Sequence, residues 1–434
     1  MRIVQITPGA GESFYCENCI RDFNLVKALR KVGHDAMTVP LYLPLIRDCP
    51  EEEPARGELF FGGINVYLQQ KFALFRRTPR WLDKLLDSRL LLKWAARRAG
   101  TTAARDLGEA TLSMLRGEHG RQAKELDRLV EYLSAGRRPD VVCLSNALLA
   151  GLSRRIRERL GLPVVCWLED EDGFLDALSE PPRQEAWRTL ATDAAEIDAF
   201  AATSRYYAGT MRRRLSLPED KVHVVYPGVE VDEYPPAAAP APTVGFISRL
   251  CRAKGLDTLV EAILILKRRD GLEGIRLRAS GGSTKADEPF LADIRRRVAR
   301  AGCERDVEFL ASFDRPARID LLRTLSVLSA PTRQGEAFGL YAAEALGCGV
   351  PLVLPAHGSF VEIVESTGAG LLFEPNDPAA LAEALAEVLL NRDAARQMSR
   401  RGREAAREIF NVERTCRDFL AVCQKVVSPT AAGG

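Results

Sequence analysis

The sequence predicts an α/β protein of two domains, each with a parallel sheet covered by helices. Three observations support this class. Short β-rich runs alternate with segments of helical spacing along most of the chain. The alternation is interrupted at "EYPPAAAPAP", residues 233–242, where four prolines disfavour both helix and sheet. The length of 434 residues also exceeds what one ordinary core accommodates.

Composition narrows the class of protein further. Hydrophobic residues make up 46% and charged residues 28%, which is typical of a soluble globular protein. The net charge of only +2 gives no basic field that would favour nucleic acid. No signal-peptide pattern follows Met1, and no apolar run is long enough to span a membrane. We therefore expect a cytoplasmic protein, and because its ten cysteines are sparse we expect no structural disulfides.

The predicted strands divide into two groups around the proline-rich stretch. The first group comprises residues 3–7, 36–41, 64–68, 141–144, 164–168, 199–203 and 222–225. The second group comprises residues 243–247, 275–279, 307–310, 327–330 and 351–354. We assign residues 1–236 to a first domain, residues 237–410 to a second, and residues 411–434 to a C-terminal helix that returns to the first domain and ends in a frayed tail.

The first candidate site follows the strand at 243–247. In "SRLCRAKGLD" the cations Arg249 and Lys254 lie just beyond the strand end, and an amphipathic helix begins after Gly255. Ligands of parallel α/β proteins bind at this end of the strands. A helix amino terminus with two cations favours a diphosphate. The alternative is that both are ordinary solvated surface cations.

The second candidate site is "GEAFGLYAAEALGCGVP", residues 335–351. The pattern places Glu336 in a loop, Gly339 near a helix start and Glu344 inside that helix. Glycine lets a ligand approach the free N–H groups of the helix start, and carboxylates accept hydrogen bonds from sugar hydroxyls. The alternative is a capped helix with a solvent-facing acid.

Together these segments resemble the family 4 glycosyltransferases, retaining enzymes of the GT-B fold. Glu336 and Glu344 match the E-x7-E signature of that family, and "GFISRLCRAKGLD" resembles its G-R-L-x(n)-K-G segment. "GHDAMTVP", "VVYPGVEVDEY" and "GAGLLFEPNDPAALAEAL" are similar to three further segments of the family, and all occur in the family's order. The resemblance covers most of the chain.

The resemblance implies transfer of a sugar from a nucleotide-diphosphate-sugar donor, with retention, and without a metal ion or other cofactor. Arg249 and Lys254 would hold the diphosphate, and Glu336 would fix the sugar together with the backbone N–H groups of Phe338, Gly339 and Leu340. Glu344 would bind the ribose, and Gly11 would belong to a turn beside the donor at the mouth of the cleft. The donor base, the sugar and the acceptor are left undetermined.

The chain departs from the family pattern after the strand at 164–168. Many relatives carry a histidine there, whereas this chain has Glu169 in "LEDEDGF". Glu169, Asp170 or Asp172 could orient an acceptor hydroxyl or assist its proton loss, and the alternative is a solvated acidic loop. His357, in "PAHGSF" at a strand end, is a candidate for contact with the donor.

A second departure is "FYCENC", residues 14–19, where many relatives have a glycine-rich turn. A C-x-x-C pair at a helix start can be a redox site or half of a zinc site. No second C-x-x-C or H-x-x-x-H accompanies it. We therefore interpret Cys16, Glu17, Asn18 and Cys19 as a loop that shapes the acceptor side of the cleft.

A helical insert is predicted at about residues 70–137. Its part at 71–98 has nine lysines and arginines against two acids, interleaved with aromatic residues. Such a segment suits either a lid packed on the first domain or weak contact with the inner face of an anionic membrane.

Two other functions compete with glycosyl transfer. One is a catalytically silent protein that binds sugar nucleotides, because the family's histidine is missing. The other is a Rossmann oxidoreductase, but "GAGESF" lacks the third glycine of its fingerprint and no acid ends the second strand.

Overall fold

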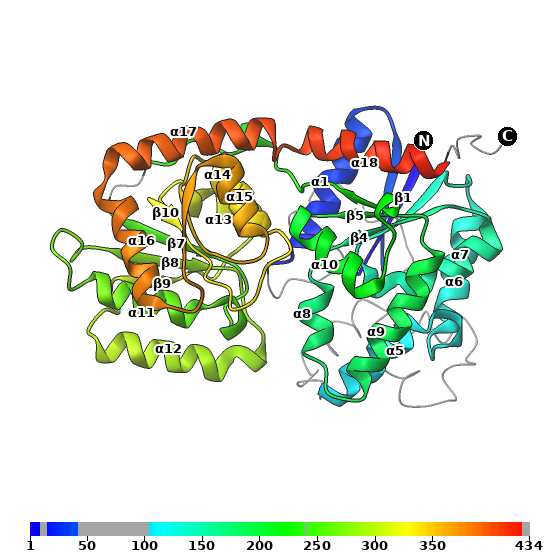
Figure 1. Ribbon diagram of the computed structural model, residues 1–434, viewed down its shortest axis with the longest axis horizontal. Coiled ribbons are helices and arrows are strands. Elements are labelled where there is room, and N and C mark those ends of the chain that lie inside the picture. The colour runs from blue at the N-terminus through cyan, green and yellow to red at the C-terminus, as the bar shows by residue number, and fades with distance from the viewer. Residues whose placement is uncertain (9–14, 42–103, 239–240, 428–434) are drawn as a thin grey trace.

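The structure is a computed structural model that describes residues 1–8, 15–41, 104–238 and 241–427. Two α/β domains lie side by side, and the helices α17 and α18 run along both of them (Figure 1). Within these described residues, each domain has a six-stranded parallel sheet whose strands are mostly buried and apolar. Such runs are expected where helices cover both faces of a sheet.

The first sheet has the order β2-β1-β3-β4-β5-β6. The strand order reverses at β1, which pairs in parallel with β2 on one side and with β3 on the other. The strands are β1 (Arg2–Thr7), β2 (Asp35–Pro40), β3 (Val141–Leu144), β4 (Val164–Leu168), β5 (Ala199–Ala202) and β6 (Val222–Val224).

Helices of the first domain form two separate apolar clusters with this sheet. One cluster joins α1 and α18 to Ile3, Val141 and Trp167, and the other includes most of the remaining helices. The helices are α1 (Glu17–Lys31), α5 (Ala104–Leu115), α6 (Ala123–Ala135), α7 (Ser153–Leu160), α8 (Glu171–Asp176), α9 (Pro182–Asp193) and α10 (Arg205–Leu215).

The second sheet has the order β12-β11-β10-β7-β8-β9, the doubly wound arrangement of dinucleotide-binding domains. Its switch point lies between β7 and β10, which are paired. The strands are β7 (Thr243–Ile247), β8 (Arg276–Ser280), β9 (Val307–Phe309), β10 (Val327–Leu328), β11 (Leu352–Pro355) and β12 (Gly370–Phe373).

One continuous apolar cluster fills the second domain. Within it α11 packs on α16, and α14 packs on α17. The helices are α11 (Leu256–Leu266), α12 (Glu288–Arg300), α13 (Arg315–Leu322), α14 (Leu340–Gly347), α15 (Ser359–Thr367), α16 (Pro378–Leu390) and α17 (Arg392–Glu408).

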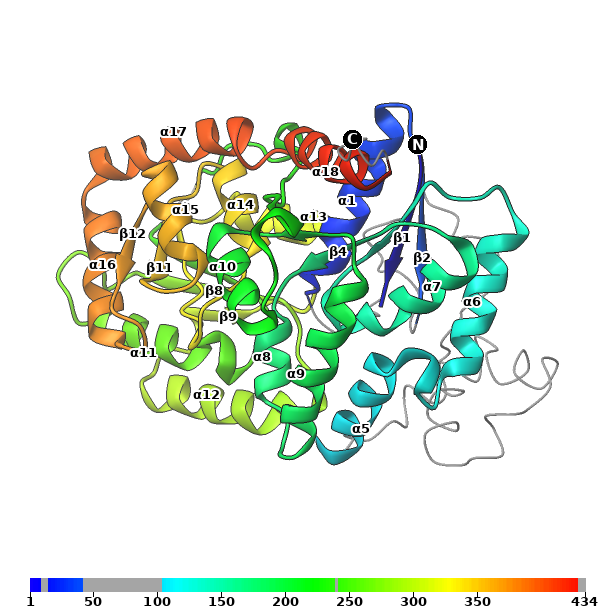
Figure 2. The ribbon, with the colours of Figure 1, turned by 45° about the vertical axis from the view of Figure 1, so that its right-hand side comes forward.

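The C-terminal helix α18 (Val412–Val427) crosses to the first domain and packs beside α1 (Figure 2). Its Phe419 stacks on Trp167 of β4, with ring centroids 5.2 Å apart. Val229 and Asn411 form an isolated bridge where the chain passes between domains in both directions. The two domains are therefore joined by two neighbouring segments.

The predicted strands agree with the observed ones to within one or two residues at each end, and the run at 64–68 lies outside the described residues. The strand predicted at 327–330 is shorter, because only Val327 and Leu328 pair with neighbours.

Candidate active site

The candidate site lies at the switch point of the second sheet, where the loops after β7 and β10 meet. The 3-10 turn η7 (Arg252–Lys254) follows β7, and the loop from Ala330 to Gly339 follows β10. Ligands of open α/β sheets bind at such points.

A close contact between the backbones at Gly255 and Pro331 brings Lys254 beside Glu336. Gly255 has φ +74°, and a Cβ there would lie 1.7 Å from the carbonyl oxygen of Pro331. Only glycine allows this approach, which brings the start of α11 onto the loop after β10. The ammonium of Lys254 forms an ion pair with the carboxylate of Glu336, and the Glu336 side chain is only 3% exposed.

The amino terminus of α14 points into the same site. Its N-cap Gly339 has φ +83°, and the first helical N–H, that of Leu340, donates to the carboxylate of Glu17 at 2.6 Å. The N–H of Ala337 donates to Asp170 at 2.9 Å. Both acceptors belong to the first domain, so carboxylates of one domain bind the free amides of the other.

Three carboxylates surround the single ammonium of Lys254. Burial would lower the pKa of Lys254, but Glu336, Asp170 and Glu17 outweigh this effect and raise it. Burial raises the pKa of Asp170 to about 6, with a further contribution from Glu336. Burial and the neighbouring Glu336 also raise the pKa of Glu17. The site thus has more negative than positive charge around Lys254.

Glu344 is fully buried and bound by protein groups. Its carboxylate accepts from the hydroxyls of Tyr15 at 3.0 Å and Tyr234 at 2.9 Å. The guanidinium of Arg318, 1% exposed, donates to the same carboxylate at 3.0 and 3.1 Å. Glu344 therefore does not face solvent, and a ribose would have to replace one of these partners. Its binding of a ribose stays a prediction.

Arg249 and Lys254 follow the same strand but bind different carboxylates. The guanidinium of Arg249 pairs with Asp287 at 2.8 Å and donates to the Thr284 hydroxyl at 2.9 Å. Asp287 is the N-cap of α12. In the structure the two predicted cations thus pair with different carboxylates, and their joint binding of a diphosphate stays a prediction.

The predicted acceptor-side acids have separate surroundings. Glu169 is 2% exposed and forms an ion pair with the buried Arg21, and burial raises the pKa of Glu169 to about 8. Asp172 accepts from the Tyr207 hydroxyl at 3.0 Å. Neither residue belongs to a solvated loop, and Asp170 is the acid of this segment that reaches the second domain.

His357 follows β11 and borders the Glu336 loop. The N–H of Ser359 donates to the Glu336 carbonyl at 3.1 Å, which fixes the turn containing His357 beside that loop. Burial lowers the pKa of His357, and its Nε2 is buried without a hydrogen-bond partner among the described residues. A neutral imidazole is thus available for a ligand on this side.

Cys16 and Cys19 form a disulfide, contrary to the expectation of no structural disulfides. Cys16 is the N-cap of α1 and Cys19 lies in its first turn, so their Cα atoms are 5.5 Å apart, within the range of disulfides. Glu17 and Asn18 lie between them in the sequence. The pair therefore braces the start of α1 next to the site.

Sequence reasoning missed Tyr15, Tyr234 and Arg318, which surround Glu344. Tyr234 lies within the proline-rich stretch 233–242, where no sequence pattern indicates that its side chain is buried. Arg318 does carry a signal, because it interrupts the apolar face of α13 with a charged side chain that has to find a buried partner.

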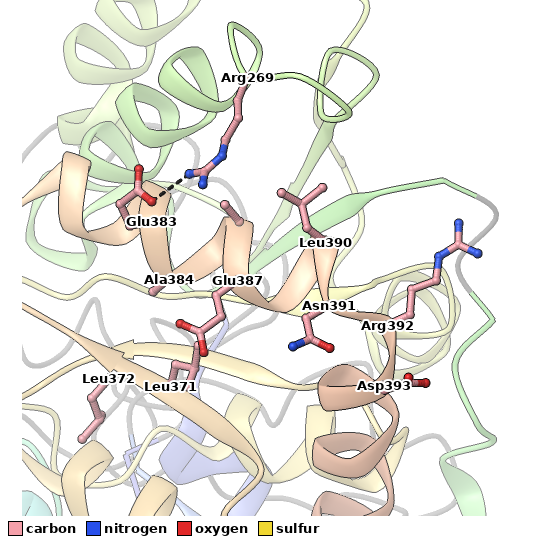
Figure 3. A pocket seen from close by; sticks show the side chains of 11 residues that line it. Arg269, Leu371, Leu372, Glu383, Ala384, Glu387, Leu390, Asn391, Arg392 and Asp393 are labelled. Atoms are coloured by element: carbon pink, nitrogen blue, oxygen red, sulfur yellow. Dashed lines mark hydrogen bonds and ion pairs between the residues drawn. The ribbon is translucent and has the colours of Figure 1, made fainter.

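A cavity of about 840 Å³ lies outside the candidate site, beside the edge strand β12 (Figure 3). Its wall includes Arg269 and Glu383, which pair at 2.8 Å. No residue of the candidate site lines this cavity. Arg269 is therefore a cation outside the candidate site.

In the part of the chain that the structure describes, no group of three His, Cys, Asp or Glu side chains is arranged to hold a metal ion. Likewise, none of the helices placed there combines the length and the apolar character needed to cross a membrane. Gly11 and the basic segment 71–98 fall outside the described residues.

Two family models match consecutive parts of the chain. The model "Glycosyltransferase Family 4" matches residues 105–233, and "Glycosyl transferases group 1" matches residues 234–405. D-inositol 3-phosphate glycosyltransferases are among the similar proteins. The one from Jonesia denitrificans is 29% identical over 48% of this chain and 52% of its own length, and that of Corynebacterium jeikeium is 30% identical over 40% and 44%. The chain thus spans about half the length of the curated relatives it matches.

Solved structures share the fold across the chain. Sucrose-phosphate synthase from Thermosynechococcus elongatus matches with a TM-score of 0.73 and 18% identity, over 99% of this chain and all of the other. Anabaena Alr3699/HepE in complex with UDP matches with a TM-score of 0.68 and 15% identity, over 98% and 100%. These likenesses, with the two facing parallel sheets, confirm the predicted GT-B fold.

Proposed function

Because the chain belongs to the family 4 glycosyltransferases, we propose that it moves a sugar from a nucleotide-diphosphate-sugar donor to an acceptor. We further propose that the configuration of the sugar is retained, that no metal ion takes part, and that the protein works in the cytoplasm. Binding of UDP by a protein of the same fold supports a nucleotide donor.

One observation carries this proposal. Lys254, Glu336 and the first N–H of α14 converge at the switch point of the second sheet. A diphosphate placed there would receive an ammonium and the positive end of a helix, both of which favour negative charge. An ordinary solvated cation would not be paired with a carboxylate whose side chain is only 3% exposed.

The chemistry follows from where charge develops. When the bond between the sugar and the diphosphate breaks, the leaving diphosphate gains negative charge. Lys254 and the Leu340 N–H stabilise that charge without moving, and such preorganised groups supply much of an enzyme's rate. Glu336, fixed by Lys254, would hold the hydroxyls of the transferred sugar, and His357 could donate or accept beside it.

The acceptor would lie against the first domain, and we propose Asp170 as the acid beside it. Asp170 contacts the second domain next to Glu336, whereas the carboxylate of Glu169 is taken by Arg21. With a pKa near 6, Asp170 could accept a hydrogen bond from an acceptor hydroxyl at neutral pH.

The test is release of nucleoside diphosphate from UDP-, GDP-, ADP- and dTDP-sugars, each with and without crude acceptor mixtures. We expect turnover of one donor and a loss of about 100-fold or more in Lys254→Ala, because a charge-stabilising group is removed. Glu336→Ala should lose turnover as well.

Arg269→Ala is the matched control, since it removes a cation that lies at the remote cavity. It should turn over like the unmodified protein. Wild-type turnover in Lys254→Ala would overturn the proposed site. Nucleotide binding without turnover of any donor would instead favour a silent sugar-nucleotide-binding protein.

A further inference from the structure

Tyr15 reaches from the first domain into the second. It lies just before α1, yet its N–H donates to the carbonyl of Gly281 after β8 at 2.8 Å. Its side chain is 5% exposed, and its hydroxyl donates to Glu344 at 3.0 Å. The guanidinium carbon of Arg318 lies 5.2 Å from the centre of the Tyr15 ring. A residue of one domain thus fills a built pocket in the other.

Glu17 makes a second contact of the same kind. Its carboxylate accepts the Leu340 N–H at 2.6 Å, at the amino terminus of α14. It also lies close enough to Lys254 to contribute to the raised pKa of that ammonium. A carboxyl oxygen therefore already occupies the helix terminus, next to the cation that would receive a phosphate.

We propose that residues 15–17 are an internal competitor of the nucleotide donor. The Tyr15 hydroxyl takes the place of a ribose hydroxyl on Glu344, and the Glu17 carboxylate takes the place of a phosphate oxygen on the Leu340 N–H. This inference rests on the proposed function, because it assigns those two groups to the donor. It states in addition that the donor binds only when residues 15–17 leave them.

Charge makes the competition exclusive. Lys254 already faces the carboxylates of Glu17, Asp170 and Glu336. A diphosphate in the same place would bring further negative charge beside Glu17, and like charges at contact distance repel strongly. Displacing Glu17 relieves this repulsion and frees the helix terminus in one movement.

The disulfide restrains the backbone of residues 15–17. Cys16 caps α1 and is bonded to Cys19, so the backbone on both sides of Glu17 is tied to the first turn of that helix. Tyr15 and Glu17 flank the N-cap, and they contact Glu344 and Leu340 from one short segment. Residues 15–17 can therefore leave both groups together.

The test is titration calorimetry with UDP, GDP, ADP and dTDP on the full chain. Tyr15→Phe keeps the ring but removes the hydroxyl, and Glu17→Gln keeps the shape but removes the charge. Each should tighten binding of the preferred nucleotide by about tenfold. Tyr15→Phe loses its hydrogen bond to the Glu344 carboxylate. Glu17→Gln can still accept the Leu340 N–H, but it loses the charge that opposes an incoming phosphate. The double variant should bind more tightly still.

Tyr234→Phe is the matched control. It removes another phenol hydroxyl from Glu344 at 2.9 Å, but it does not belong to the competing segment. It should not tighten binding. Unchanged or weaker binding in both Tyr15→Phe and Glu17→Gln, with a wild-type protein that binds, would overturn this inference and leave the proposed function intact. If neither the wild type nor the double variant binds any nucleotide, both are overturned.

Hydrogen exchange on the unmodified protein gives a second readout that needs no variant. The Tyr15 N–H is bonded to Gly281, so its exchange should accelerate when the preferred nucleotide is added and residues 15–17 leave. Slower exchange at these residues would mean that they close over the nucleotide, which contradicts the proposal.

Discussion

Among the described residues, each domain has one buried arginine that binds a carboxylate near the site, and the two arginines differ in the domain that their partners belong to. In the first domain Arg21 pairs with Glu169 and Asp22, donates to the Ser145 carbonyl at 2.6 Å, and lies 4.3 Å from the Trp167 ring. Every one of these partners belongs to the same domain.

In the second domain Arg318 holds Glu344 and the Phe313 carbonyl, but its aromatic neighbour is Tyr15 of the first domain. Tyr15 also shares Glu344 with Arg318. The comparison shows that a buried ion pair can serve one domain's stability alone or can couple that domain to its neighbour. The Arg21 group does the first, and the Arg318 group does the second.

The largest expected effect is that of Arg21→Met on stability. It leaves the carboxylates of Asp22 and Glu169 buried without their cation, which costs about 3–5 kcal/mol of unfolding free energy. Urea unfolding measures this change. Arg297→Met, which removes an exposed ion pair with Glu261, should cost less than about 1 kcal/mol. Equal losses in the two variants would contradict a buried role for Arg21.

Arg318→Met should lower the unfolding free energy by less, about 2–3 kcal/mol, because the hydroxyls of Tyr15 and Tyr234 still donate to Glu344.

Double-mutant cycles with Tyr15→Phe test whether each arginine is coupled to the other domain. Arg318→Met and Tyr15→Phe should be non-additive, by about 0.5 kcal/mol or more, since both residues bind one carboxylate. Arg21→Met and Tyr15→Phe should be additive. Additivity in both cycles would remove the coupling that we assign to the Arg318 group.

The smallest expected effect is a change of the unfolding free energy with pH. It arises from Asp170, which accepts the Ala337 N–H of the second domain, whereas the neighbouring Glu169 pairs with Arg21. Burial raises the pKa of Asp170 to about 6, above its unfolded value, so the folded state holds this proton more tightly. Stability from this group is present at low pH and is lost as the pH rises to about 6.

Asp170→Asn removes this titration but keeps the oxygen that accepts the Ala337 N–H. Between pH of about 4 and about 7, the unfolding free energy of the wild type should fall relative to Asp170→Asn. We expect a difference of about 1 kcal/mol, because Asp170 is only partly buried. A pH profile identical in both proteins would show that Asp170 titrates as it does in the unfolded chain.

The sequence by itself predicts the two sheets, the second candidate site at residues 335–351 and the resemblance to family 4 glycosyltransferases. Strand and helix periods are local properties, and the proline-rich segment marks the boundary between domains without reference to distant residues. The positions of Lys254, Glu336 and Gly339 around β7, β10 and α14 follow from the same local order. A ligand site is predictable from these positions because ligands of α/β sheets bind at the strand ends, beside the helix starts.

Only the tertiary structure decides what binds Glu344, Glu169 and Leu340. Tyr15 and Glu344 are 329 positions apart, and their hydrogen bond exists because two domains close on each other. The spacing of Glu336 and Glu344 does not reveal that Glu336 pairs with Lys254 while Glu344 pairs with Arg318. Burial and long-range pairing depend on the packed chain as a whole, so no local pattern specifies them.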